Sequence, residues 1–358
     1  MKILFVHLGG NPPSYLVENL LSFRARFPHL DLRLILSEGS RVPKQLRSIS
    51  VYFDNSNQRD HLFANSRHDP KFRNQFWRRS IERILAVCEY QMQNADSQVL
   101  HIESDILVLP GFPFEKLTEI KSVAWQNYND DRDVASILFL PNKNLSSWLY
   151  DKLVDHVLNN YTATDMTSLR EIRRNHPDQC LIIPCLSEGI NSAVNQGYLS
   201  AHLNSVNPVL MKGIFDSAQI GMWLTGMDPR NTYGVLRIHD RTILDNAEAP
   251  LDPSRLNYSI DAQGNLYAIL ESNYEVPIFS LHIHSKRLQL FKSDYIEELT
   301  GFVKLANSQK QAIRRFEIFV LFKLFYNSLI SGNLISFLLG IPFVYKVRRK
   351  IRKVVRRS

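Results

Sequence analysis

The first 36 residues alternate between strand-like and helix-like patterns of hydrophobic positions. Residues 2–8 (KILFVHL) form a short apolar run, and in residues 30–36 (LDLRLIL) every second residue is leucine, as in a strand. Between these two runs, the apolar residues of 16–21 follow helical spacing, and Pro28 ends the segment. This strand–helix–strand order predicts a parallel sheet with helical cover.

The same alternation continues to about residue 290. Periodic apolar positions predict helices over 76–93 and near 144–159, and residues 54–74 are predicted to be a polar loop. Short apolar runs predict further strands at 49–53, 98–102, 122–126, 136–141, 181–183, 266–270 and 277–284. The sequence therefore predicts an α/β fold, a mixed sheet flanked by helices, without internal repeats.

Charge is distributed unevenly along the chain. The 358 residues are 44% hydrophobic and carry a formal net charge of +8. Residues 346–358 (KVRRKIRKVVRRS) hold eight basic residues and no acid, so subtracting eight from +8 leaves a net charge of zero for residues 1–345. A balanced body disfavours nucleic-acid binding. Three cysteines without a metal or disulfide spacing indicate reduced thiols, and the N-terminal apolar run is too short for a signal peptide.

The C-terminal segment has the composition of a membrane-binding element. Residues 324–345 contain no charged residue, but their asparagines, serines and proline make a poor membrane span. The apolar residues that follow recur every three to four positions among the basic ones, which is typical of a helix lying on an anionic membrane surface. We expect a domain over 1–300 and a helical segment over 301–358 that attaches peripherally to the inner face of the cell membrane. A true span, or a contact with a protein or nucleic acid, stays the alternative.

Two carboxylates interrupt an apolar stretch at residues 99–112 (VLHIESDILVLPGF). Glu103 and Asp105 follow a predicted strand, and ligands of open α/β sheets bind beyond the carboxyl ends of strands. A divalent cation with phosphate oxygens would remove the cost of desolvating both carboxylates. The alternative is a surface turn whose acidic residues face water.

Two later segments carry further polar groups. In residues 279–288 (FSLHIHSKRL), strand alternation would place His282 and His284 on one face, with Lys286 following. Imidazole can complete the coordination of Mn²⁺, although one core and one surface histidine would fit equally well. In residues 215–231 (FDSAQIGMWLTGMDPRN), the glycines suggest close approach of a backbone or a ligand, or a helix break.

Four motifs occur in a fixed order along residues 1–290: F-W-x-x-x-x-E-R from Phe76, H-I-E-S-D at 101–105, F-D-x-A-x-I-G…G-x-D-P-R-N at 215–231, and L-H-I-H-S-K at 281–286. This set resembles the GT-A-type glycosyltransferases with a D-x-D-like motif that build bacterial cell-surface polysaccharides. The sequence departs from the family pattern at Glu103, which replaces an aspartate, and at Met222, where a polar residue is expected.

The resemblance implies a nucleotide-sugar donor and a divalent metal, Mn²⁺ or Mg²⁺, on its diphosphate. It implies Asp105 as a metal ligand, Glu103 on the metal or the donor ribose, and one of His282 and His284 completing the site. Further donor contacts are expected at His7, Gly10, Asn11, Ser37, Arg83, Ser104 and Lys286. Asp216 is the first choice for the catalytic base and Glu188 the second.

We therefore expect an enzyme that transfers a sugar to a glycan acceptor, free or lipid-linked, in surface polysaccharide synthesis. One alternative is a metal-dependent nucleotidyltransferase or phosphohydrolase, which would use the same carboxylate and metal chemistry. The other is a catalytically silent scaffold that binds glycan or membrane and tolerates the loss of Asp105.

Overall fold

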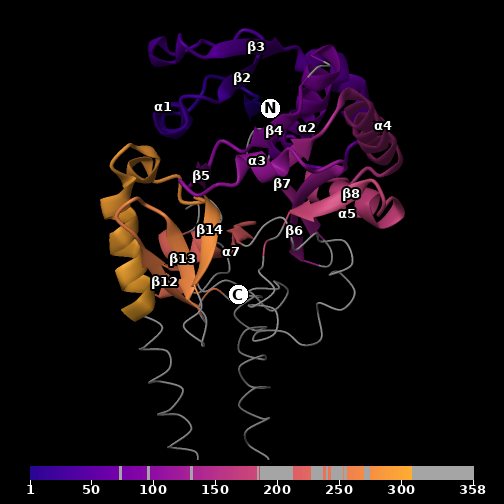
Figure 1. Cartoon of the computed structure of the whole chain (residues 1–358). Coiled ribbons are helices and arrows are strands. Elements are labelled where there is room, and N and C mark those ends of the chain that lie inside the picture. The colour runs from indigo at the N-terminus through magenta and orange to yellow at the C-terminus, as the bar shows by residue number, and fades with distance from the viewer. Residues whose placement is uncertain are drawn as a thin grey trace, which may run out of the picture.

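The computed structural model describes most of the chain up to residue 308. The described residues are 1–71, 75–94, 97–129, 132–183, 185, 213–226, 237–238, 241–242, 253, 256–269 and 275–308. They confirm the predicted α/β architecture, with two sheets flanked by helices (Figure 1). Glu188 and the predicted membrane segment 324–358 lie outside the described residues.

The larger sheet has seven strands in the order β3-β2-β1-β4-β7-β6-β8. These strands are β1 (Lys2–His7), β2 (Asp31–Ser37), β3 (Ser50–Asp54), β4 (Val99–Ile102), β6 (Val123–Asn129), β7 (Arg132–Leu140) and β8 (Cys180–Ile183). β3, β2, β1 and β4 run parallel, and β7 is antiparallel to both of its neighbours. The carboxyl ends of β1 and β4 therefore meet at one edge, where α/β sheets bind ligands.

Helices cover both faces of the larger sheet, because its central strands are apolar on both sides. In β1, Ile3 and Phe5 belong to the core under α1 (Ser14–Arg26), whereas Leu4 and Val6 belong to the opposite core. That opposite face is covered by α2 (Phe76–Gln93), α4 (Lys143–Asn159) and α5 (Asp165–Asn175), as Figure 1 shows. Each fully buried Ile, Leu, Val or Phe contributes on the order of 1.5–3 kcal/mol, so the two cores hold the three layers together.

The smaller sheet lies beside the first and contains β12 (Asn257–Ile260), β13 (Leu266–Ile269), β14 (Glu275–His282), β5 (Ile106–Val108) and β9 (Ile214–Phe215). It packs against α7 (Gln219–Thr225), the 3-10 helix η7 (Leu288–Phe291) and a helix at 295–308. The last helix crosses residue 300 and buries Val303 in this core. The division into 1–300 and 301–358 stays a prediction, because 309–358 lie outside the described residues.

The remaining elements are short: α3 (Phe114–Leu117), β10 (Arg237–Ile238), β11 (Arg241–Thr242) and the 3-10 helices η1 (Lys44–Leu46) and η2 (Ser56–Phe63). The helices and strands predicted between residues 2 and 284 all occur, within a few residues at their ends. The prediction of a plain loop over 54–74 was wrong, because η2 lies inside it. β5, β12 and α5 were not predicted, since β5 has only three residues, β12 (NYSI) has only two apolar ones, and α5 is mostly polar.

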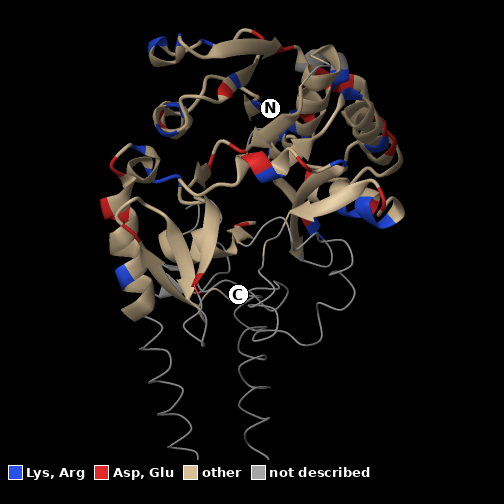
Figure 2. Cartoon of the chain, in the orientation of Figure 1, with Lys and Arg blue, Asp and Glu red and all other residues tan. Residues whose placement is uncertain are grey.

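Acidic and basic residues are interspersed over α2, α4 and α5 in Figure 2, in keeping with the balanced charge of residues 1–345. Among the described helices, none has the length and apolar character needed to cross a membrane.

Candidate metal and donor site

The acidic turn lies where the chain crosses from the larger sheet to the smaller one. β4 belongs to the seven-stranded sheet, and β5, directly after the turn, belongs to the five-stranded sheet. The Glu103 N–H donates to the Ser136 carbonyl at 2.8 Å, and the Ile283 N–H donates to the Asp105 carbonyl at 2.8 Å. The two carboxylates therefore interrupt the apolar stretch at the point where the chain passes from one sheet to the other.

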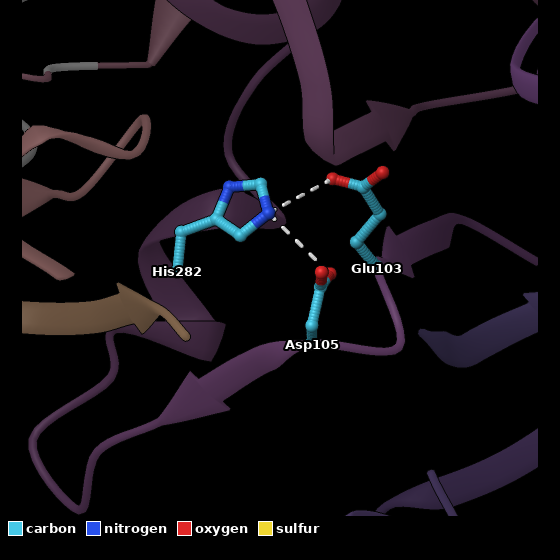
Figure 3. Close-up of side chains that lie close together, drawn as sticks. All are labelled: Glu103, Asp105 and His282. Atoms are coloured by element: carbon cyan, nitrogen blue, oxygen red, sulfur yellow. Dashed lines mark ion pairs between the residues drawn. The ribbon is translucent and has the colours of Figure 1, made fainter. Parts of the chain in front are cut away.

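Glu103, Asp105 and His282 meet at this crossing (Figure 3). The His282 Nε2 atom lies 3.4 Å from Asp105 Oδ1 and 3.8 Å from Glu103 Oε2. One potential ligand atom from each residue lies within 4.8 Å of the other two. His282 is the last residue of β14, so each sheet contributes to the cluster.

The cluster fits a divalent metal ion. Two carboxylates and one imidazole form a donor set that suits Mn²⁺, and the carboxylates alone suit Mg²⁺. Asp105 and His282 are buried, so a cation among these donors would offset the repulsion between two poorly solvated carboxylates. The residues present therefore satisfy the predicted metal chemistry, while the identity of the ion stays a prediction.

His284 is not among the three residues that meet in this cluster, and a part for it in metal binding stays a prediction. The prediction placed it beside His282 on one strand face, but β14 ends at His282 and His284 lies in the following turn. Its ring packs against the His282 ring, with the two centroids 4.2 Å apart. The strand alternation that would have aligned both imidazoles stops too early, and His282 alone completes the cluster.

His282 and Asp105 stabilise one another's charged forms. Burial alone would raise the pKa of the Asp105 carboxyl, but His282 and Lys286 more than offset burial and hold that pKa well below its usual range. Burial alone would lower the pKa of the His282 imidazole, but Asp105 and the neighbouring carboxylates Glu103 and Asp216 raise it overall. The proximity of His282 thus favours the ionised form of Asp105, and the carboxylates favour the protonated form of His282.

Arg83 and Lys286 add positive charge at the turn, each beside a different carboxylate. Lys286 Nζ lies 3.5 Å from Asp105 Oδ2. Arg83, on α2, donates a short hydrogen bond to Glu103 and lies 3.6 Å from Asp165 Oδ2. The sequence predicted both cations, but it did not predict Asp165, which is the first residue of α5. Their roles as donor contacts stay predictions.

A buried asparagine donates hydrogen bonds to the backbone of the acidic turn. Asn19, on α1, is 0% exposed, and its side-chain amide donates to the carbonyl oxygens of Ser104 at 3.0 Å and Ile106 at 2.9 Å. The Ser104 hydroxyl lies 3.4 Å from the Tyr15 hydroxyl of the same helix. Neither α1 residue was predicted as part of the site. The available signal for Asn19 was its position on the apolar face of the predicted helix.

The residues predicted to face the nucleotide base lie together after β1 and β2. His7 ends β1, and the Ser37 hydroxyl, at the end of β2, accepts a hydrogen bond from the Gly9 N–H at 2.8 Å. Asn11 Oδ1 accepts from a backbone N–H of the loop after β2 at 2.8 Å. Gly9 and Gly10 have φ angles of 97° and 132°, which favour glycine. The two loops are thus joined at the ligand-binding edge, and base recognition itself stays a prediction.

Asp216 lies beside the cluster, but its carboxylate is fully engaged by backbone N–H groups. It is 1% exposed, and its two oxygens accept four backbone N–H groups. A carboxylate offers about four lone-pair positions, so no position remains for a substrate hydroxyl. This geometry gives no support to the prediction that Asp216 is the catalytic base. The second choice, Glu188, lies outside the described residues.

Comparison with known proteins yields distant structural likenesses. No protein-family model and no curated protein matches the chain. The galactosyltransferase LgtC with donor and acceptor sugar analogues is similar at a TM-score of 0.37 and 12% identity, over 57% of this chain and 82% of that one. An active-site mutant of LgtC gives 0.37 and 14%, over 59% and 85%. The PaToxG glycosyltransferase gives 0.30 and 10%, over 49% and 69%. At these TM-scores, the likenesses assign no activity to this chain.

Proposed function

We propose that this protein is a metal-dependent glycosyltransferase that uses a nucleotide-sugar donor. The observation that carries the proposal is the meeting of Glu103, Asp105 and His282 beyond the carboxyl end of β4, with Lys286 beside them. Cations held by carboxylates bind the phosphate oxygens of nucleotides well. The ordered motifs that resemble GT-A-type enzymes place the same residues in donor and metal binding.

The neighbouring groups suit the breaking of a sugar–phosphate bond. The departing nucleoside diphosphate gains negative charge, which positioned cations stabilise. A divalent ion at Glu103, Asp105 and His282 would act as a Lewis acid toward the phosphate oxygens. Lys286 would pair with those phosphates as a point charge, and Arg83 would contact the donor from α2. The joined loops after β1 and β2 would hold the nucleoside.

The acceptor hydroxyl has to lose a proton during transfer. Because the Asp216 oxygens already accept backbone hydrogen bonds, we assign the base to Glu188. This assignment rests on the sequence motif S-E-G-I-N at 187–191. Loss of glycosyl transfer in Glu188→Gln, with donor binding retained, would support it.

The proposal extends to where the enzyme acts. The apolar segment 324–345 and the basic segment 346–358 would attach it to an anionic membrane surface, where a lipid-linked glycan can be the acceptor. Synthesis of a surface polysaccharide at the inner face of the cell membrane would follow. Co-sedimentation with anionic vesicles, compared between the full chain and a chain ending at residue 323, tests this part.

A binding screen tests the central proposal. Thermal unfolding is followed with nucleoside diphosphates and nucleotide sugars, with and without Mn²⁺, for the wild type, Asp105→Ala and the control Asp151→Ala, an exposed residue of α4. A ligand at about 100 times its Kd adds roughly 2.7 kcal/mol to the free energy of unfolding. We expect metal-dependent stabilisation by one nucleotide class in the wild type and in Asp151→Ala, and none in Asp105→Ala.

Two other outcomes would replace the proposal. Turnover of a nucleoside triphosphate or phosphoester without an acceptor sugar would indicate a nucleotidyltransferase or phosphohydrolase. If the folded protein responds to no nucleotide with metal present, the donor site does not exist and a scaffold is the better account.

A further inference from the structure

Asp216 ties the start of α7 to the end of β14, two segments that are distant in the sequence. It follows β9 directly and precedes α7, while the strand end that it contacts belongs to β14. Its Oδ2 atom accepts from the His282 N–H at 3.0 Å and from the Gly221 N–H at 2.7 Å. Its Oδ1 atom accepts from the N–H groups of Ala218 at 3.0 Å and Ile220 at 2.9 Å. One carboxylate thus fixes the start of α7 and the backbone of a metal-ligand residue.

The packing around this carboxylate leaves little room for movement. A Cβ atom on Gly221 would lie 2.1 Å from the His282 carbonyl oxygen and 2.8 Å from Asp216 Oδ2. The absence of a side chain at Gly221 therefore allows α7 to approach the end of β14 closely enough for the shared hydrogen bonds. The backbone of His282 is enclosed by Asp216 on its N–H and by α7 on its carbonyl group.

We propose that Asp216 is a positioning residue that presets His282 for metal binding. This inference rests on the proposed metal site, and it assigns to Asp216 a role other than that of a base. The imidazole can face Glu103 and Asp105 only while the last residue of β14 stays in place. Charge-assisted hydrogen bonds to backbone N–H groups are strong, so the carboxylate resists displacement of that residue.

The first test compares Mn²⁺ binding by three proteins without nucleotide. Asp216→Asn keeps the shape of the side chain but turns one acceptor oxygen into a donor that faces N–H groups. Asp133→Asn is the matched control, because Asp133 is a fully buried carboxylate that accepts from Trp125, Asn127 and Arg173 and touches none of the three cluster residues. Isothermal calorimetry gives the Kd, and thermal unfolding reports how far each variant is destabilised.

We expect Asp216→Asn to bind Mn²⁺ about 10- to 100-fold more weakly than the wild type, the usual effect of losing a group that orients a ligand. Asp133→Asn should lose stability and keep the wild-type Kd for Mn²⁺ within about twofold, since destabilisation alone does not change the orientation of the metal ligands. An unchanged Kd in folded Asp216→Asn would overturn the inference while leaving the proposed function intact. Failure of the wild type to bind Mn²⁺ would instead refute the metal site.

A second measurement uses only the wild-type protein and does not depend on a variant that folds. Amide hydrogen exchange is compared with and without Mn²⁺ at Gly221 and His282. If Asp216 presets the ligand, both amides exchange slowly before metal is added and change little afterwards. Fast exchange without metal that becomes slow with metal would show that the ion orders His282, and would overturn the inference.

Discussion

Replacing Asn19 with leucine should loosen the acidic turn without touching a metal ligand. Asn19 is buried on α1, and its amide group donates to the carbonyl oxygens on either side of Asp105. Its Oδ1 atom has no hydrogen-bond partner among the described residues. Asn19→Leu keeps the branched shape and the number of non-hydrogen atoms, and it removes the two donated hydrogen bonds.

The size of the effect follows from those two bonds, of 3.0 Å and 2.9 Å. Leaving a buried carbonyl unsatisfied costs about 1–3 kcal/mol, and the added leucine regains part of this by apolar burial. We therefore expect a loss of roughly 2–4 kcal/mol in the free energy of unfolding. Because the freed turn carries Glu103 and Asp105, the affinity for Mn²⁺ should fall by about tenfold or more.

Gln91 provides a matched control within the same protein. It is buried on α2, and its side-chain amide donates to the carbonyls of Ser97 at 2.9 Å and Leu140 at 3.0 Å, at the other end of β4. Because Gln91 Oε1 also accepts from the Ser146 hydroxyl, urea unfolding should show a loss for Gln91→Met at least as large as that for Asn19→Leu. Calorimetry should show weaker Mn²⁺ binding only in Asn19→Leu. A stability loss below about 1 kcal/mol, or equal metal affinity in both folded variants, would refute the reasoning.

Three further outcomes are expected. Arg83→Met should lose about 3–5 kcal/mol in the free energy of unfolding, because Glu103 and Asp165 lose their cation. Mn²⁺ should restore part of this free energy, and urea unfolding with and without metal measures the loss and the recovery. Cys88 and Cys180 are buried, and burial raises the pKa of the Cys180 thiol to about 12, so a thiol reagent at pH 8 should label these two only after denaturation. Gly264→Ala should lower the melting temperature and leave metal affinity unchanged, since φ there is 85° and a Cβ would lie 2.5 Å from a tyrosine hydroxyl.

Local patterns in the sequence were sufficient for much of the fold and for the centre of the site. The helix predicted over 76–93 is α2, because a long stretch of amphipathic periodicity specifies one face for the core. Glu103 and Asp105 stood out because charge is rare between two apolar runs. His282 and Lys286 stood out through their chemistry, and the structure brings both to Asp105.

Contacts between distant segments could not be predicted from the sequence. The run of 99–112 is apolar on both sides of the turn, so nothing local shows that β5 joins a second sheet. Asn19 and Asp165 act on the turn from α1 and α5, and such contacts depend on how helices dock rather than on their periodicity. The prediction that His282 and His284 share one strand face was wrong, because strand alternation holds only while the strand lasts and β14 ends at His282.

The crossing between the two sheets also determines when during synthesis the site can exist. β5 pairs with β14, and the imidazole that lies beside the acidic turn, that of His282, belongs to the same late strand. During translation, Glu103 and Asp105 are therefore synthesised long before His282, the residue that completes their cluster. A chain that ends before His282, even with its first strands and α1 in place, cannot assemble the three donors. Loading of the proposed metal site therefore requires a chain synthesised at least through His282 and folded, and fragments that end before this residue would lack the imidazole donor.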